Sequence, residues 1–88
     1  MAYFGQDIEQ VQMLANQLNA RAGEVEKLIA QLSATVDSIE WQGPDAERFK
    51  ADWKGQHAAQ LRAVVSTLQT ASQDARRNAQ DQQMASGR

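Results

Sequence analysis

An apolar residue recurs at alternating steps of three and four residues, without a break, from Ile8 to Ile39. Such a heptad repeat keeps the apolar side chains on one side of an α-helix that packs lengthwise against a neighbouring helix. The a positions of the repeat are Ile8, Ala15, Ala22, Ile29 and Val36, and the d positions are Val11, Leu18, Val25, Leu32 and Ile39. Leu14 and Leu28 at g positions widen the stripe, as expected of a helix that has more than one neighbour. The repeat predicts a long helix over about residues 7–40.

The heptad repeat stops at Trp41–Asp45, a segment that favours a turn. Gly43 can adopt a positive φ without steric cost, and Pro44 cannot continue a helix but suits the first position of a new one. Acidic side chains follow directly, where the dipole of a new helix favours negative charge. We therefore expect a connection over about residues 41–44 and a second helix over about residues 45–83.

The second half of the chain carries an apolar stripe of its own. Its members are Ala46, Phe49, Trp53, His57, Leu61, Val64, Leu68, Ala71, Ala75, Asn78 and Gln82. The stripe steps by four residues twice between Trp53 and Leu61, an irregularity called a stutter that locally unwinds a supercoil. Val65 extends the stripe sideways. The stripe turns polar beyond Ala75, and residues 84–88 are predicted to form a disordered tail.

Two helices alone cannot cover both stripes. The chain has 88 residues, enough for one small domain, and a single two-helix layer leaves one side of each wide stripe in water. Pairing two hairpins into a four-helix bundle buries that side. We therefore expect an all-α fold, an antiparallel helix-turn-helix hairpin over residues 1–88 that dimerises into a four-helix bundle. The residues expected in the dimer and hairpin seam are Ile8, Val11, Leu14, Leu18, Val25, Leu28, Ile29, Leu32, Val36, Ile39, Phe49, Trp53, His57, Leu61, Val64, Val65 and Leu68.

The composition excludes several classes of function. The absence of Cys excludes disulfides, thiolate metal sites and cysteine nucleophiles, and a net charge of -2 argues against binding nucleic acid through its phosphates. The one His, His57, lies on an apolar stripe, where a packed side chain is more typical than a catalyst. No stretch approaches the roughly 20 apolar residues of a membrane-spanning helix. We therefore expect a protein that is not an enzyme, binds no cofactor or metal, and does not insert stably into membranes.

Trp41 and Gly43 form a Trp-x-Gly motif in the turn between the two expected helices. With the following segment 44–49 and the length of the hairpin, the motif resembles the WXG-motif family of small helical-hairpin proteins, relatives of the early secreted antigenic target. The resemblance covers about residues 6–83. It implies a protein made in the cytoplasm and exported folded, without a cleavable signal peptide, by a type VII secretion system whose ATPase is a partner. Members of the family serve as substrates, partners or chaperone-like carriers.

The chain departs from the family in its export signal, a Tyr-x-x-x-Asp/Glu motif soon after the core of the second helix. Asn78 and Gln82 stand at these two positions. Residues Tyr3 and Asp7 have the required spacing, but at the opposite end of the chain. The chain therefore travels with a signal-bearing partner, uses a different signal, or is not a substrate. The expected partner is a second copy of the chain or a sister WXG-motif protein. The alternative is a cytosolic structural or adaptor coiled-coil domain without an export role, in which Trp-x-Gly is only a turn.

Overall fold

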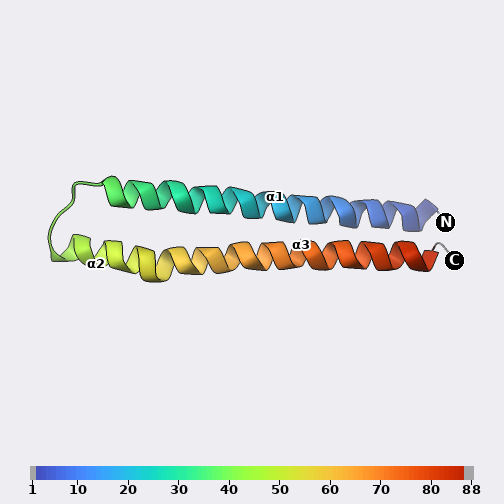
Figure 1. The fold of residues 1–88 in the computed structure, drawn as a ribbon. Coiled ribbons are helices and arrows are strands. Elements are labelled where there is room, and N and C mark those ends of the chain that lie inside the picture. Colours follow the sequence, from blue (N-terminus) through green and yellow to red (C-terminus); the bar gives the residue numbers. More distant parts are fainter. Residues whose placement is uncertain (1, 87–88) are drawn as a thin grey trace.

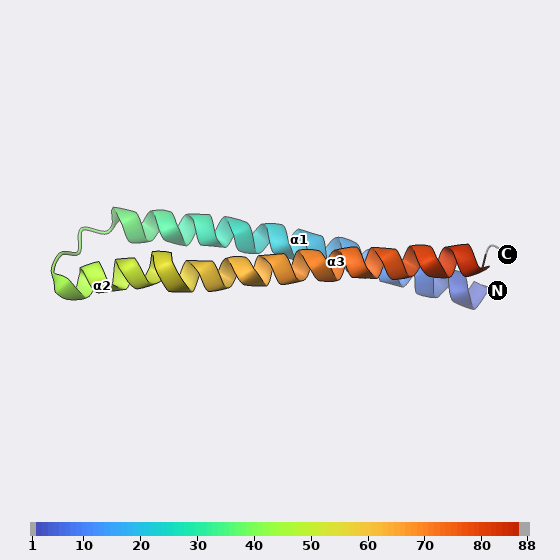
Figure 2. The ribbon, with the colours of Figure 1, turned by 60° about the horizontal axis from the view of Figure 1, so that its bottom comes forward.

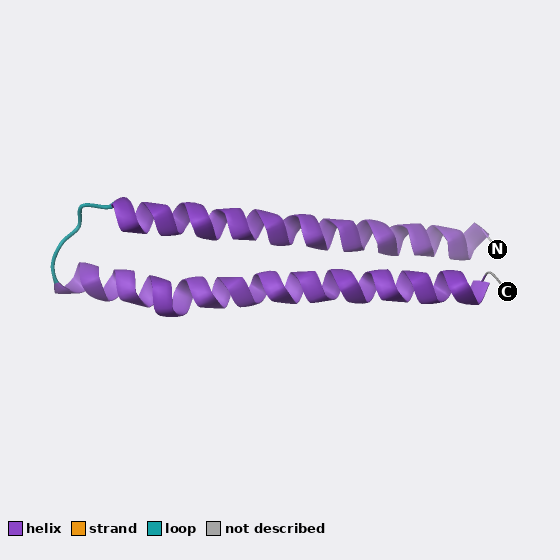
Figure 3. Cartoon of the chain, in the orientation of Figure 1, coloured by secondary structure: helices purple, strands orange, loops and turns teal. Residues whose placement is uncertain are grey.

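The computed structural model is a hairpin of two long helical arms joined by one short connection (Figures 1 and 3). The structure describes residues 2–86, with side chains from 8 to 85. The helical elements, in chain order, are α1 (Ala2–Ser38), α2 (Pro44–Asp52), the π-helical turn η1 (Trp53–His57) and α3 (Ala58–Ser86). No strand occurs in the described part of the chain. The predicted all-α helical hairpin is thus confirmed.

The two outer ends of the hairpin are helical further than the sequence predicts. The first helix begins at Ala2 rather than near residue 7, and α3 continues to Ser86 through most of the segment 84–88 that we expected to be disordered. Residues 87 and 88 lie outside the described part of the chain. The segment after Ala79 contains three Gln, Met84 and Ala85, all residues of high helix propensity, and the two ends lie side by side (Figures 1 and 2).

The connection between the arms is shifted towards the first helix. Because α1 ends at Ser38, the connection comprises residues 39–43 rather than 41–44. Gly43 has a φ of 115°, a conformation that a residue with a Cβ rarely adopts. Pro44 is the first residue of α2, where its missing N–H costs nothing. The turn therefore uses the glycine and the proline as the sequence indicates.

The first arm turns a narrow row of side chains towards the second. The buried apolar residues of α1 are the a positions of the heptad repeat, namely Ile8, Ala15, Ala22, Ile29 and Val36. At the d positions, Val11, Leu18 and Val25 are half-buried, whereas Leu32 is exposed. Within one chain, therefore, only one edge of the predicted stripe is fully covered.

The second arm packs a row of small side chains against α1. The buried residues are Ala46, Ala58, Val65, Ser72 and Ala79, of which the last four recur every seven residues. The predicted stripe passes one residue earlier, through His57 and Val64. Val65 is 5% exposed and Val64 is 46% exposed, so the structure corrects the phase of the row that faces α1. We call the buried rows of the two arms the hairpin seam.

One extra residue in the second arm accounts for the one-residue offset between the predicted stripe and the buried row. The backbone N–H of Ala58 donates to the carbonyl of Trp53, the five-residue reach of a π-helix. The eight residues from Trp53 to Leu61 are therefore divided into steps of five and three, through Ala58. The predicted stutter divides the same interval into two steps of four, through His57. A π-helical turn, not a stutter, absorbs the irregularity.

The hairpin is long and thin, with principal extents of 67 × 16 × 12 Å. Its radius of gyration is 19.6 Å, against about 12 Å for a compact domain of this length. The accessible surface is 6721 Å², about 1,600 Å² above the value expected for a compact monomer of 9.7 kDa. None of the described helices has an apolar stretch long enough to cross a membrane.

Candidate interaction face

The long sides of the hairpin differ from one another because the heptad positions beside the seam differ. In an antiparallel helix pair, the d and g positions of both helices lie on one side of the seam and the e positions lie on the other. On the first of these sides the d rows are mainly apolar, and the g rows add Leu14 and Leu28 of α1 and Val64 and Ala71 of α3. We define the apolar face as Val11, Leu14, Leu18, Val25, Leu28 and Leu32 of α1 with Leu61, Val64, Leu68, Ala71 and Ala75 of α3.

The large side chains of the apolar face remain in water in the single chain. Leu14, Leu28, Leu32 and Val64 are each about half exposed, with Leu28 the most exposed of these at 53%. Single exposed apolar residues are ordinary on protein surfaces, whereas a contiguous row of them marks a binding surface or an aggregation risk. The row follows both arms, and its d positions other than Leu32 are already half-buried by the hairpin seam. This face is the candidate functional site.

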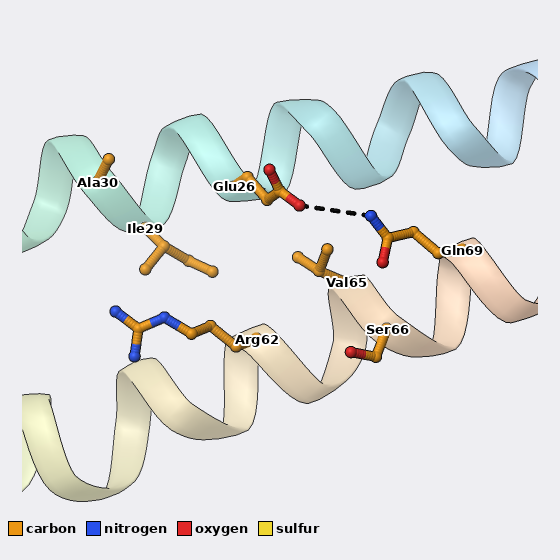
Figure 4. Close-up of a pocket in the computed structure, with 7 residues that line it drawn as sticks. All are labelled: Glu26, Ile29, Ala30, Arg62, Val65, Ser66 and Gln69. Atoms are coloured by element: carbon orange, nitrogen blue, oxygen red, sulfur yellow. Dashed lines mark hydrogen bonds between the residues drawn. The ribbon is translucent and has the colours of Figure 1, made fainter.

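The opposite side is polar and is bridged between the arms. Gln69 Nε2 donates to Glu26 Oε1 at 3.5 Å, and Arg76 Nη2 donates to Asn16 Oδ1 at 3.1 Å. Figure 4 shows Glu26 and Gln69 reaching towards one another across an open groove of about 410 Å³. The residues lining the groove are Glu26, Ile29, Ala30, Arg62, Val65, Ser66 and Gln69. We call this side the polar face, because polar side chains of the two arms are hydrogen-bonded across it.

A buried hydroxyl fixes how the arms are aligned lengthwise. Ser72 is 2% exposed, and its Oγ donates to the carbonyl oxygen of Ala15 at 2.7 Å. The hydroxyl fits there because Ala15 and its neighbours in the seam are small and let the helices approach. The bond joins the two arms only in this register, so it favours this lengthwise alignment.

The Trp-x-Gly motif lies at the tip of the hairpin. Trp41 belongs to the connection, is 45% exposed, and has its ring centroid 5.8 Å from that of Phe49 at an angle of 50°. Gly43 supplies the positive φ that lets the chain enter α2. The two residues of the motif therefore have different roles. Gly43 shapes the turn, and Trp41 presents an aromatic ring beside it.

Two polar contacts hold the beginning of the second arm against the last turns of α1 and the connection. Trp53 Nε1 donates to Ser33 Oγ at 2.9 Å, and Lys50 Nζ donates to the carbonyl oxygen of Ile39 at 3.2 Å. Trp53 is half-buried and lies within the first residues of the π-helical turn. The π-helical turn thus lets both Trp53, its first residue, and Ala58, the residue after it, face α1.

The remaining predicted residues lie away from these contacts. His57 is exposed, with its ring centroid 6.5 Å from that of Trp53. Asn78 and Gln82, at the positions of the missing export signal, are both exposed on α3 and one helical turn apart. The side chains of Tyr3 and Asp7 lie outside the described residues. No group of three or more potential metal-ligating side chains occurs among the described residues.

Sequence reasoning missed three small residues of the seam, Ala58, Ser72 and Ala79. Together with Val65 they recur every seven residues, and this spacing was the available signal, but the predicted stripe followed His57, Val64, Ala71 and Asn78, one position earlier. Comparison with protein-family models, with curated proteins and with solved structures gave no match.

Proposed function

We propose that this protein is a small non-enzymatic partner in type VII secretion, acting as a substrate or chaperone-like carrier through pairing of helical hairpins. Pairing occurs through the apolar face, and two hairpins form a four-helix bundle. The tip, with Trp41 and Gly43, is the part that the secretion ATPase reads. The pair is made in the cytoplasm and leaves it folded.

The observation that carries the proposal is the contrast between the two long sides. Leu14, Leu28 and Val64 are about half exposed on the apolar face, while Glu26 and Gln69 are bonded across the polar face. Covering one large aliphatic side chain is worth about 1.5–3 kcal/mol relative to full exposure. Half-exposed side chains repeated along both arms supply a driving force for association that a single hairpin leaves unused.

The position of the motif supports the secretion role. Trp41 is exposed at the tip, at the end of the hairpin far from the two termini (Figure 1). A ring at that place stays accessible when the long apolar faces are paired, because the connection extends beyond the helices of the seam. Asn78 and Gln82 lack the chemistry of the tyrosine–acid signal, which favours export together with a signal-bearing chain or by another signal.

Export is tested by expressing the protein in its native host with and without the secretion ATPase. We expect the intact chain in the culture supernatant only when the ATPase is present. Trp41→Ala is expected to reduce export strongly while leaving helix content unchanged, and Glu40→Ala, in the same exposed connection, serves as the matched control. Retention of the wild-type protein inside cells that export other substrates contradicts the secretion role.

The alternative is a cytosolic adaptor built on the same paired hairpin. The apolar face supports the adaptor equally, because the face indicates that two hairpins pair but not whether they act inside or outside the cell. Neighbouring genes that encode a secretion ATPase favour the first proposal. Their absence, together with a protein confined to the cytoplasm, favours the adaptor.

A further inference from the structure

We propose that the π-helical turn η1 is a conformational switch that sets which side of the hairpin the large apolar residues of α3 face. In the π setting, which the structure shows, α3 contributes its apolar rows to the apolar face. In the α setting, η1 relaxes to ordinary α-helix, and α3 rotates by about 100°, the angle between successive residues of an α-helix. The inference goes beyond the proposed function and concerns the folded single hairpin, whether or not the protein is exported.

The part of the second arm before η1 is held in place by side-chain hydrogen bonds. Lys50 Nζ donates to the carbonyl oxygen of Ile39, and Trp53 Nε1 donates to Ser33 Oγ. The irregularity begins at Trp53, whose carbonyl accepts the backbone N–H of Ala58, five residues later. Single π-helical turns inside α-helices are rare and are frequent at functional sites. A rotation of α3 can therefore begin at η1 while the tip stays where it is.

Relaxing the turn moves every residue of α3 by one step around the helix. Without the extra residue, the helix that passes through Trp53 returns to the seam at His57 instead of Ala58. Each later residue takes the direction that the next residue has in the structure, so Val64 replaces Val65 in the seam. The rows beside the seam move in the same way. On the apolar face Leu61, Leu68 and Ala75 are replaced by Gln60, Thr67 and Asp74, and they move to the side that Arg62, Gln69 and Arg76 occupy in the structure.

The extra residue of η1 is thus what brings the apolar rows of the two arms to the same side. In the structure, Leu14 and Leu28 of α1 lie on the side of the seam that also carries Val64 of α3. In the α setting, α1 keeps its apolar row there, but the row of α3 beside it becomes mainly polar. The π-helical turn therefore determines whether the hairpin presents an apolar surface built from both arms or from α1 alone.

Contacts between the arms favour the π setting over the α setting. Ser72 Oγ donates to the carbonyl oxygen of Ala15 at 2.7 Å, and two further hydrogen bonds cross the polar face. The α setting breaks these bonds and brings His57 and Asn78, both exposed in the structure, into the seam. It also replaces the rare π-helical turn by ordinary α-helical hydrogen bonds. Because packed side chains interdigitate, the two settings are discrete, and the α setting is the minor one.

Disulfide trapping distinguishes the two settings, because the chain has no native Cys and a disulfide requires Cβ atoms that face one another at short range. Ala22 packs in one buried cluster with Val65, so the pair Ala22→Cys/Val65→Cys reports the π setting. The pair Ala22→Cys/Val64→Cys reports the α setting, since Val64 is 46% exposed in the structure. In dilute redox buffer we expect the second pair to close about tenfold or more slowly than the first, as a minor state allows. Ala22→Cys/Ala63→Cys, in which position 63 faces α1 in neither setting, gives the background rate.

Two further changes shift the balance in opposite directions. His57→Ala/Asn78→Ala removes the polar side chains that the α setting would bury, so we expect it to speed closure of the pair at positions 22 and 64 by about tenfold. Deletion of Gly55 removes the extra residue while keeping the present seam, so we expect it to reduce closure of that pair to the background rate. Gln56→Ala/Gln80→Ala, at exposed neighbouring positions, is the matched control and is expected to leave the rate unchanged.

Peptide mapping identifies disulfides formed within one chain, and circular dichroism confirms that each reduced variant stays helical. Closure of the pair at positions 22 and 64 at the background rate, both in the otherwise unchanged chain and with His57→Ala/Asn78→Ala, overturns the inference. Closure that persists after deletion of Gly55 overturns it as well, because local fraying rather than rotation then joins the two cysteines. These measurements use one purified chain, so their outcome is separate from that of the export test.

Discussion

Two glycines show how the same residue serves opposite purposes in this chain. Gly43 has a φ of 115° and precedes α2, whereas Gly23 lies within α1 with open space around the position of a Cβ. We expect Gly43→Ala to destabilise the protein by about 1–3 kcal/mol, because alanine is strained at that φ. Gly23→Ala is the matched control and is expected to stabilise it by about 0.5–1 kcal/mol. Urea unfolding followed by circular dichroism measures both, and changes of the same sign contradict the assignment of Gly43 to the turn.

The buried hydroxyl of Ser72 gives a second prediction at the residue scale. Ser72→Ala removes a 2.7 Å hydrogen bond to Ala15 but leaves no buried group without a partner in the helix, so we expect a loss of about 1 kcal/mol. Ser72→Leu is expected to cost more, because the seam there is lined by small residues. Ser66→Ala, at the edge of the polar groove, is the control and should change the unfolding free energy by a few tenths of a kcal/mol at most. If Ser72→Leu is as stable as the wild type, the close approach of the arms at Ala15 is wrong.

At the scale of the elements, the heptad repeat of the first half could be predicted residue by residue. The a positions from Ile8 to Val36 are buried in the hairpin as the repeat indicates. The seam residues of the second half could not be predicted in this way, because the strongest apolar periodicity there marks the apolar face and not the hairpin seam. Val64 with Leu61 and Leu68 forms the open apolar face, while small residues such as Ala58 and Ala79 line the seam. Small side chains allow close packing but carry little apolar signal, so sequence patterning finds them last.

The candidate site was easier to anticipate than the seam. The g positions Leu14 and Leu28 already indicate a second neighbour, and the structure leaves both exposed on one side. The tip was also foreseeable, since Gly43 and Pro44 have backbone preferences that depend little on context. The π-helical turn could not be foreseen. The eight residues from Trp53 to Leu61 fit two steps of four as well as a step of five followed by a step of three.

The π-helical turn itself predicts the effect of a deletion. Removing Gly55 from η1 leaves the steps of three and four unbroken from Ala46 to Ala79, so a continuous α-helix can keep the same seam. We expect this deletion to stabilise the hairpin by about 1 kcal/mol, since it also removes a helical glycine. Deleting Gln73 from α3 is the control and is expected to destabilise, because it rotates the following seam residues by about 100°. Loss of helix content after deletion of Gly55 contradicts a single-residue insertion in the second arm.

At the scale of the whole molecule, substitutions on the apolar face are expected to disrupt pairing without unfolding the hairpin. Leu28 is exposed in the single hairpin, so Leu28→Asp should leave the arms folded but place unpaired charges inside the paired interface. We expect this variant to be a helical monomer. Ala30→Asp, on the groove of the polar face, is the matched control and is expected to pair like the wild type. Leu18→Asp is expected to disrupt pairing and also weaken the hairpin, because Leu18 is half-buried against the second arm.

The hairpin, 67 × 16 × 12 Å in extent, buries one row of side chains from each arm, and its exposed surface exceeds that of a compact monomer. We therefore propose that another hairpin covers the apolar face. The mass of the purified protein in solution, measured by sedimentation equilibrium from micromolar concentration upwards, tests it most directly. We predict twice the chain mass of 9.7 kDa for the wild type and a single chain for Leu28→Asp. A wild-type mass of one chain throughout, with a thermal transition independent of concentration, would contradict pairing of this chain with itself.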